Sequence, residues 1–163
     1  MGVIARVLGK ELSYDNWPKS HDSYRSDMAR AAGIGVARIR CHRTTWDYLL
    51  ESVPRNFEEE LYSRKSAGAA FRPPSKEEIT AEKDGMATVP LSGTALAAVL
   101  SWCRNIQSHT VSSPWSTLDR SIGRRVGVAI SQALDNVVPC RGQDGPTAMI
   151  YLDDRIAESD VTT

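Results

Sequence analysis

Two apolar stripes at helical spacing, within residues 92–138, restrict the fold of this chain more than any other feature. The first stripe follows the extended run 87–91, and Ser92 is placed to act as its N-cap. The second follows Ser113 and Pro114, an N-cap residue and a proline at the first helical position, and it stops before a further proline. The stripes comprise Leu96, Val99, Leu100, Cys103 and Ile106, and then Trp115, Leu118, Ile122, Val126, Ala129, Ala133 and Val137.

This spacing predicts a core pair of antiparallel amphipathic helices, over about 92–107 and 114–137, because the connection between them is short. Gly123 and Gly127 lie inside the second helix, where a glycine costs about 1 kcal/mol relative to alanine. Close packing against another backbone would compensate for that cost, and the alternative is a tolerated weakness.

The remaining pattern predicts an α+β fold that is predominantly helical and contains a few short strands. Residues 87–91 and 147–152 are the clearest strand candidates. The length of 163 residues, with 41% hydrophobic and 25% charged residues, is typical of one globular domain, so we expect residues 1–163 to form a single domain.

Two segments are expected to stay outside the core. Residues 72–85 contain only one sizeable apolar residue, Ile79, and begin with a capping box formed by Ser75 and Glu78. This composition predicts either an exposed polar helix, which Gly85 could terminate, or an exposed connector. The acidic residues 153–163 predict a solvated tail.

The cysteine pattern and the hydropathy favour a cytoplasmic protein. Cys41, Cys103 and Cys140 are an odd number at wide spacing, which suits reduced thiols better than a disulfide framework. No apolar run approaches the length of a membrane span, and the first residues lack the core of a signal peptide. We therefore expect no membrane partner.

Residues 25–43, RSDMARAAGIGVARIRCHR, contain small and apolar residues at defined places. Ala29 would let two helices approach, Gly33 would allow a turn, and Ile34 and Ile39 would be buried anchors. The pattern resembles the helix-turn-helix of many bacterial repressors. The resemblance implies a DNA-binding regulator whose second helix enters a major groove. The arginines that this helix would bring to nucleic acid are Arg38, Arg40 and Arg43.

A strand is the alternative structure for part of the same segment, since residues 34–40 partly alternate in polarity. The zero net charge of the chain also weakens the DNA-binding hypothesis, although residues 1–43 carry eight basic and four acidic residues. The sequence therefore leaves both structures, the helix-turn-helix and the strand, as alternatives for this segment.

No set of residues has the spacing of a known catalytic or metal site. Cys41 and His42 are adjacent, so their side chains do not face each other on a helix or a strand. Cys103 and His109 match no standard zinc spacing, and the pair Asp153 and Asp154 lacks a third carboxylate. We expect no catalytic residues, no metal and no cofactor.

By elimination, the leading hypothesis is a small non-enzymatic protein that acts through contacts with another protein or with itself. It would be a regulator, an inhibitor or immunity-type partner, or a subunit of an oligomer or larger assembly. Trp102 lies beside the apolar stripe of its helix; if exposed, it would form an interface anchor with Arg104 or Arg120, and core burial is the alternative. We expect Trp102→Ala or Arg124→Glu to release the partner.

Overall fold

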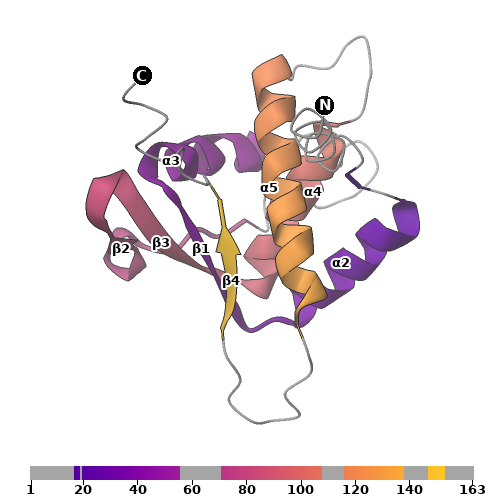
Figure 1. The fold of residues 1–163 in the computed structure, drawn as a ribbon, viewed down its shortest axis with the longest axis horizontal. Helices are drawn as coiled ribbons and strands as arrows, with labels where there is room; N and C mark the ends of the chain where they lie inside the picture. The colour runs from indigo at the N-terminus through magenta and orange to yellow at the C-terminus, as the bar shows by residue number, and fades with distance from the viewer. Residues whose placement is uncertain (1–16, 19, 56–70, 108–115, 138–146, 153–163) are drawn as a thin grey trace, which may run out of the picture.

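The computed structural model describes residues 17–18, 20–55, 71–107, 116–137 and 147–152. These residues form four α-helices and a four-stranded mixed sheet, which confirms the α+β class (Figure 1). The elements in chain order are α2 (His21–Gly33), β1 (Val36–His42), α3 (Arg43–Ser52), η1 (Val53–Arg55), η4 (Lys76–Glu78), β2 (Thr80–Ala81), η5 (Lys83–Gly85), β3 (Met86–Ser92), α4 (Gly93–Asn105), α5 (Thr117–Asp135) and β4 (Ala148–Tyr151).

The sheet has the strand order β2-β3-β1-β4. Strand β1 lies at its centre, antiparallel to β3 and parallel to β4, while β2 runs antiparallel to β3. Strands β1 and β2 therefore point the same way with β3 between them, and α3 lies on the connection, as in a split βαβ unit.

The prediction of a second helix in the helix-turn-helix is wrong, because residues 36–42 form strand β1. Only the first helix is present, as part of α2. The strand alternative is confirmed for these residues: Ala37, Ile39 and Cys41 are buried, and the side chains between them point the other way. Pairing with β3 and β4 along β1 satisfies its backbone on both sides, which an isolated sequence pattern does not reveal.

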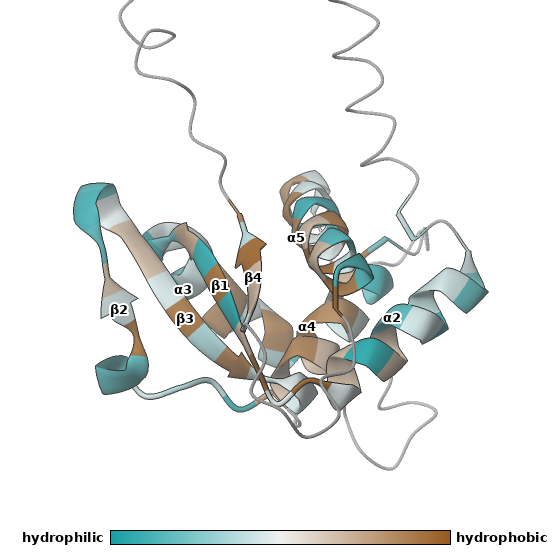
Figure 2. Ribbon diagram, turned by 60° about the horizontal axis from the view of Figure 1, so that its bottom comes forward, coloured by the Kyte–Doolittle hydropathy of each residue, from teal (hydrophilic) through white to brown (hydrophobic). Residues whose placement is uncertain are grey.

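Helix α4 begins where the capping pattern predicts. Ser92 Oγ accepts a hydrogen bond from the Ala95 backbone N–H at 3.2 Å. The helix packs against α2, against α5 and against the sheet. Figure 2 shows the sheet on one side of α4 and α2 on the other, with α4 coloured as the most hydrophobic helix. This central position buries nearly the whole circumference of α4.

Helix α5 matches the predicted stripe only in part: Val126 is buried, and Ile122, Ala129, Ala133 and Val137 are partly buried against the core. Its N-cap is Ser116, three residues after the predicted one, and Leu118 is 65% exposed instead of buried. The predicted residues Ser113, Pro114 and Trp115 lie outside the described residues. The positions of α5 that are buried are Gly123, Val126, Gly127, Val128, Ile130 and Leu134.

Both glycines inside α5 pack closely, but against side chains instead of the predicted backbone. A methyl group on Gly123 would overlap with the side chain of Ile106, and one on Gly127 would lie 2.6 Å from the Trp17 ring. The stripe prediction considered only apolar side chains, so it did not indicate that Ile106 and Trp17 pack against these two glycines.

Of the two alternatives for residues 72–85, the polar helix does not form, and most of these residues are exposed. The capping box at Ser75 is present, with its backbone N–H donating to Glu78 Oε2 at 2.9 Å, but it starts only the single turn η4. The chain then pairs as β2 with β3 and turns back at Asp84 and Gly85, whose φ angles are 63° and 76°. The predicted tail, residues 153–163, lies outside the described residues.

Candidate binding surface on the open face of the sheet

The sheet carries a second row of side chains, on the face opposite the helices, which we call the open face. In the register of the strands, Arg38 lies between Pro90 of β3 and Met149 of β4. Arg40 lies between Thr88 and Tyr151 in the same way. Because residues paired across a sheet share a face, these side chains form one continuous surface. The open face consists of Val36, Arg38, Arg40, Thr88, Pro90, Met149 and Tyr151.

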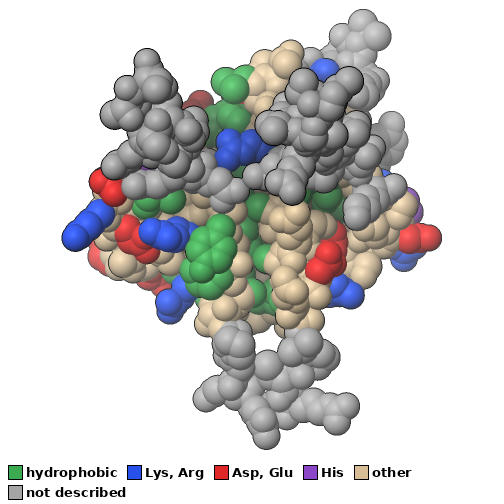
Figure 3. Space-filling model, in the orientation of Figure 1, with side chains coloured by type: hydrophobic (Ala, Val, Ile, Leu, Met, Phe, Trp, Pro, Cys, Tyr) green, Lys and Arg blue, Asp and Glu red, His purple; other side chains and the backbone are tan. Residues whose placement is uncertain are grey.

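Two of the large hydrophobic residues on the open face are strongly exposed. Tyr151 is 58% exposed and Val36 is 53% exposed. Figure 3 shows hydrophobic and basic side chains next to each other over β1 and β4. Exposed tyrosine beside arginine is the combination found at the energetic centres of protein interfaces.

Arg40 is anchored by Glu82, the residue that follows β2. Its Nε donates to Glu82 Oε2 at 2.7 Å, and Thr88 Oγ1 donates to the other carboxylate oxygen at 2.6 Å. The hydrogen bond from Thr88 and the neighbouring Arg40 lower the pKa of Glu82 below its ordinary value. The carboxylate therefore stays charged and balances the charge of Arg40.

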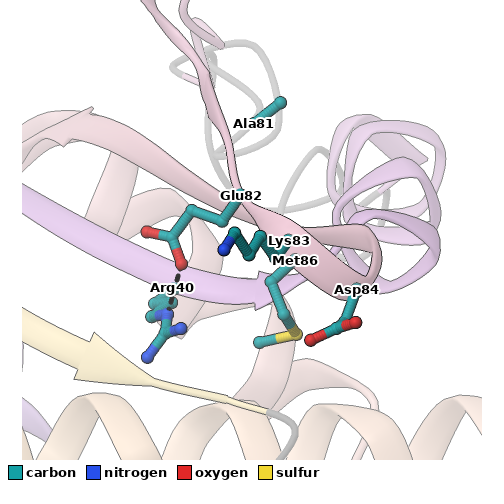
Figure 4. A pocket seen from close by; sticks show the side chains of 6 residues that line it. All are labelled: Arg40, Ala81, Glu82, Lys83, Asp84 and Met86. Carbon is teal, nitrogen blue, oxygen red and sulfur yellow. Dashed lines mark hydrogen bonds and ion pairs between the residues drawn. The ribbon is translucent and has the colours of Figure 1, made fainter.

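An open hollow of about 500 Å³ lies beside this ion pair (Figure 4). Figure 4 shows the Arg40 and Glu82 side chains pointing toward each other, with Asp84 beside Met86 at the other end. Lys83 and Ala81 complete the lining, so the hollow has no Ser, Cys or His among its lining residues. Its chemistry suits a polar contact better than a covalent reaction.

The prediction that Trp102 is an exposed interface anchor is wrong, because this residue is 0% exposed. It lies in the core and meets the ring of Tyr48 edge-on at 6.1 Å between centroids. Its predicted neighbour Arg104 stacks on the ring of Tyr24, 4.2 Å from the centroid, and its Nη2 lies 2.8 Å from Nδ1 of His21. Arg104 therefore ties α4 to α2.

Arg120 and Arg124, the other two predicted interface residues, meet at Gln107. The Gln107 side chain donates to the Arg120 carbonyl at 3.0 Å, and Arg124 Nε donates to Gln107 Oε1 at 3.3 Å. Arg120 Nε is buried and has no hydrogen-bond partner among the described residues. These contacts join α5 to the residues that follow α4.

Of the three arginines predicted for nucleic acid, the structure brings two together. Arg38 and Arg40 share the open face, whereas Arg43 begins α3. Tyr151 and Met149 were not predicted as surface residues from the sequence. The alternation of polarity in β1 and the predicted strand at 147–152 carried the signal, but the pairing of the two strands was needed to place them side by side.

A second polar cluster joins α2 to α5 beneath Trp17. Ser131 donates its hydroxyl proton to the buried carboxylate of Asp27 and accepts a hydrogen bond from Trp17 Nε1 at 3.2 Å. Burial raises the pKa of Asp27 above its ordinary value, and the hydrogen bond from Ser131 offsets only part of this effect. The cluster is enclosed, and we interpret it as structural.

Comparison of the chain with protein-family models, with curated proteins and with solved structures found no match. Within the described ranges, no three His, Cys, Asp or Glu side chains are grouped so that they could hold a metal ion. The same ranges contain no helix with the length and hydrophobicity to span a membrane.

Proposed function

We propose that this protein is a non-enzymatic binding protein that docks another protein on the open face of its sheet. The observation that carries the proposal is the exposure of Tyr151 and Val36 beside Arg38. Large apolar side chains that stay exposed next to an arginine bury favourably against a partner. This protein would then regulate its partner, inhibit it, or join it as a subunit of an assembly.

The scaffold behind this face supports the same proposal. We infer that α4 and α5 run antiparallel as an amphipathic pair, which would hold the sheet rigid from its covered side. Two cysteines, Cys41 of β1 and Cys103 of α4, are buried in the core. Three cysteines at wide spacing suit reduced thiols better than a disulfide framework, so we place the protein's work in a reducing compartment, the cytoplasm.

The test is the mass of the tagged protein purified gently from its native host, measured by size exclusion with light scattering, with mass spectrometry of co-eluting proteins. We expect a defined companion that is lost in Tyr151→Ser. The matched control is Leu118→Ser, which removes an equally exposed apolar side chain from α5 and should retain the companion.

Two results would contradict the proposal. A wild-type protein that elutes as a lone monomer has no stable partner, and a companion that survives Tyr151→Ser binds elsewhere on the surface. A mass of two copies that falls to one in Tyr151→Ser would identify the partner as a second copy of this chain.

A further inference from the structure

Arg38 occupies the middle of the open face and is bordered mainly by apolar side chains. Pro90 and Met149 flank it across the sheet, and both are half-buried. Val36 precedes it on the same face of β1, and Tyr151 lies diagonally beyond Met149 on β4. Cross-strand and diagonal neighbours lie within about 5–8 Å, so this cation is set into an apolar surround.

The two arginines of the open face differ in their electrostatic partners. Arg40 is balanced by the ion pair with Glu82, and Asp84 lies in the adjoining hollow. Arg38 forms no ion pair with any residue that the structure describes. Among the described residues, the open face therefore offers Arg38 at its centre as a positive charge without an ion-pair partner, instead of a line of such charges.

This charge pattern distinguishes two kinds of ligand. A single-stranded nucleic acid presents a repeated phosphate charge and binds along a groove with several cations and stacking aromatic rings. A protein segment can present one carboxylate between apolar side chains. The open face, with one free cation among the described residues and apolar neighbours around it, complements the protein segment better.

We propose that Arg38 receives one Asp or Glu carboxylate from a partner segment whose flanking residues are apolar. The planar guanidinium can donate two parallel hydrogen bonds to that carboxylate. Apolar contact with Val36, Met149 and Tyr151 would exclude water around the pair and strengthen it. This inference rests on the proposed function and names the chemistry by which the partner is recognised.

The experiment is selection from a library of random linear peptides with the purified protein as bait. The baits are the wild type, Arg38→Gln, Arg38→Glu and the control Arg25→Gln, which removes an exposed arginine from α2. Arg38 is exposed, so these substitutions leave the core intact, and circular dichroism verifies the fold of each bait.

We expect the wild type and Arg25→Gln to enrich peptides that carry Asp or Glu between apolar residues. The selected peptides should bind Arg38→Gln at least about tenfold more weakly, because a carboxylate is then left without its partner. Arg38→Glu should enrich Lys or Arg at the same position, since the charge at the centre of the face is reversed.

Three results would overturn the proposal. The first is enrichment of peptides without acidic residues, or of acidic peptides that bind Arg38→Gln equally well. The second is displacement of the peptides by an oligothymidine strand whose own binding depends on Arg38, which would identify a nucleic acid site. The third is no enrichment by the wild type; the proposed function would then still stand if the native companion depends on Tyr151.

Discussion

At the scale of single residues, Gly93 lies where the start of α4 approaches the end of α2 closely. It is the first residue of α4, and a side chain there would overlap with the carbonyl oxygens of Ala31 and Ile34 at the end of α2. Backbone atoms of two helices cannot yield as a flexible side chain can. The glycine therefore lets α2 cross the start of α4.

We expect Gly93→Ala to lower the free energy of unfolding by about 1–3 kcal/mol or more, because overpacking forces the two backbones apart. The measurement is urea unfolding followed by circular dichroism. The control is Gly33→Ala at the end of α2, where nothing lies within 4 Å of an added methyl group, and its effect should stay within about 1 kcal/mol. Equal stability of Gly93→Ala and the wild type would show that the helices are not in contact there.

Asp27 is the buried carboxyl group whose ionisation opposes folding. Its pKa in the folded protein is raised above the ordinary value of 3.8, mainly by burial. At a pH between 3.8 and this raised pKa, Asp27 keeps its proton in the folded protein but releases it in the unfolded chain. The contribution of Asp27 to stability is therefore largest at acid pH and is lost as the pH rises through the folded pKa.

We expect Asp27→Asn to gain stability relative to the wild type as the pH rises from 3.8 toward neutrality, because its amide stays neutral and can still accept the Ser131 hydrogen bond. The measurement is the difference in free energy of unfolding between the two proteins across this pH range. Asp22→Asn, at an exposed position of the same helix, controls for the loss of a charge. A difference that shrinks with rising pH would contradict the assignment.

At the scale of elements, α3 is tied to the first turn of α5 by Tyr48 and Asp119. The Tyr48 hydroxyl donates to one carboxylate oxygen of Asp119, and the other oxygen accepts from Ser116 at the N-cap. Burial, then the hydrogen bond to Asp119, raises the pKa of Tyr48. Burial also raises the pKa of Asp119, but the hydrogen bonds from Tyr48 and Ser116 outweigh it and leave that pKa below its ordinary value.

A double-mutant cycle of Tyr48→Phe and Asp119→Ala should give a coupling free energy of about 0.5–3 kcal/mol at neutral pH. The coupling should decrease as the pH falls through the lowered pKa of Asp119, because a protonated carboxyl group is a weaker acceptor. The measurement is chemical unfolding of the wild type, the two single variants and the double variant at two pH values, which gives the coupling free energy at each pH. Additive effects at neutral pH would show that α3 and α5 are not joined by this bond.

At the scale of the whole molecule, one hydrophobic cluster extends through the helices and the sheet. Helix α4 lies at its centre, packed against α2, α5 and the sheet. No element can leave this cluster without exposing apolar surface of its neighbours. Its members in each larger element include Ala31 of α2, Ile39 of β1, Leu49 of α3, Val89 of β3, Val99 of α4, Ile130 of α5 and Ile150 of β4.

We expect the chain to unfold in one cooperative transition, as a single domain. Trp17, Trp46 and Trp102 are buried at different places in the cluster, so tryptophan fluorescence reports on tertiary packing. Circular dichroism reports on the helices. Urea transitions that coincide by both measurements would agree with the prediction, whereas two separated transitions would divide the chain into independent parts.

The sequence by itself determined the features that depend on neighbouring residues. Ser92 starts α4 because its hydroxyl reaches an N–H three residues away, and the capping box at Ser75 forms for the same reason. The strands at 86–92 and 148–151 also follow local runs of extended-favouring residues. These signals act within a few bonds along the chain, so they need no knowledge of the fold.

The tertiary structure decided which residues became surface and which became core. Residues 36–42 form a strand because β3 and β4, from distant parts of the chain, satisfy their backbone groups. Trp102 is buried because α4 is packed between α2, α5 and the sheet, whereas Leu118 in the first turn of α5 stays exposed. The open face exists only once Arg38 and Tyr151 are aligned by strand pairing, since burial and exposure depend on contacts between residues that are far apart in sequence.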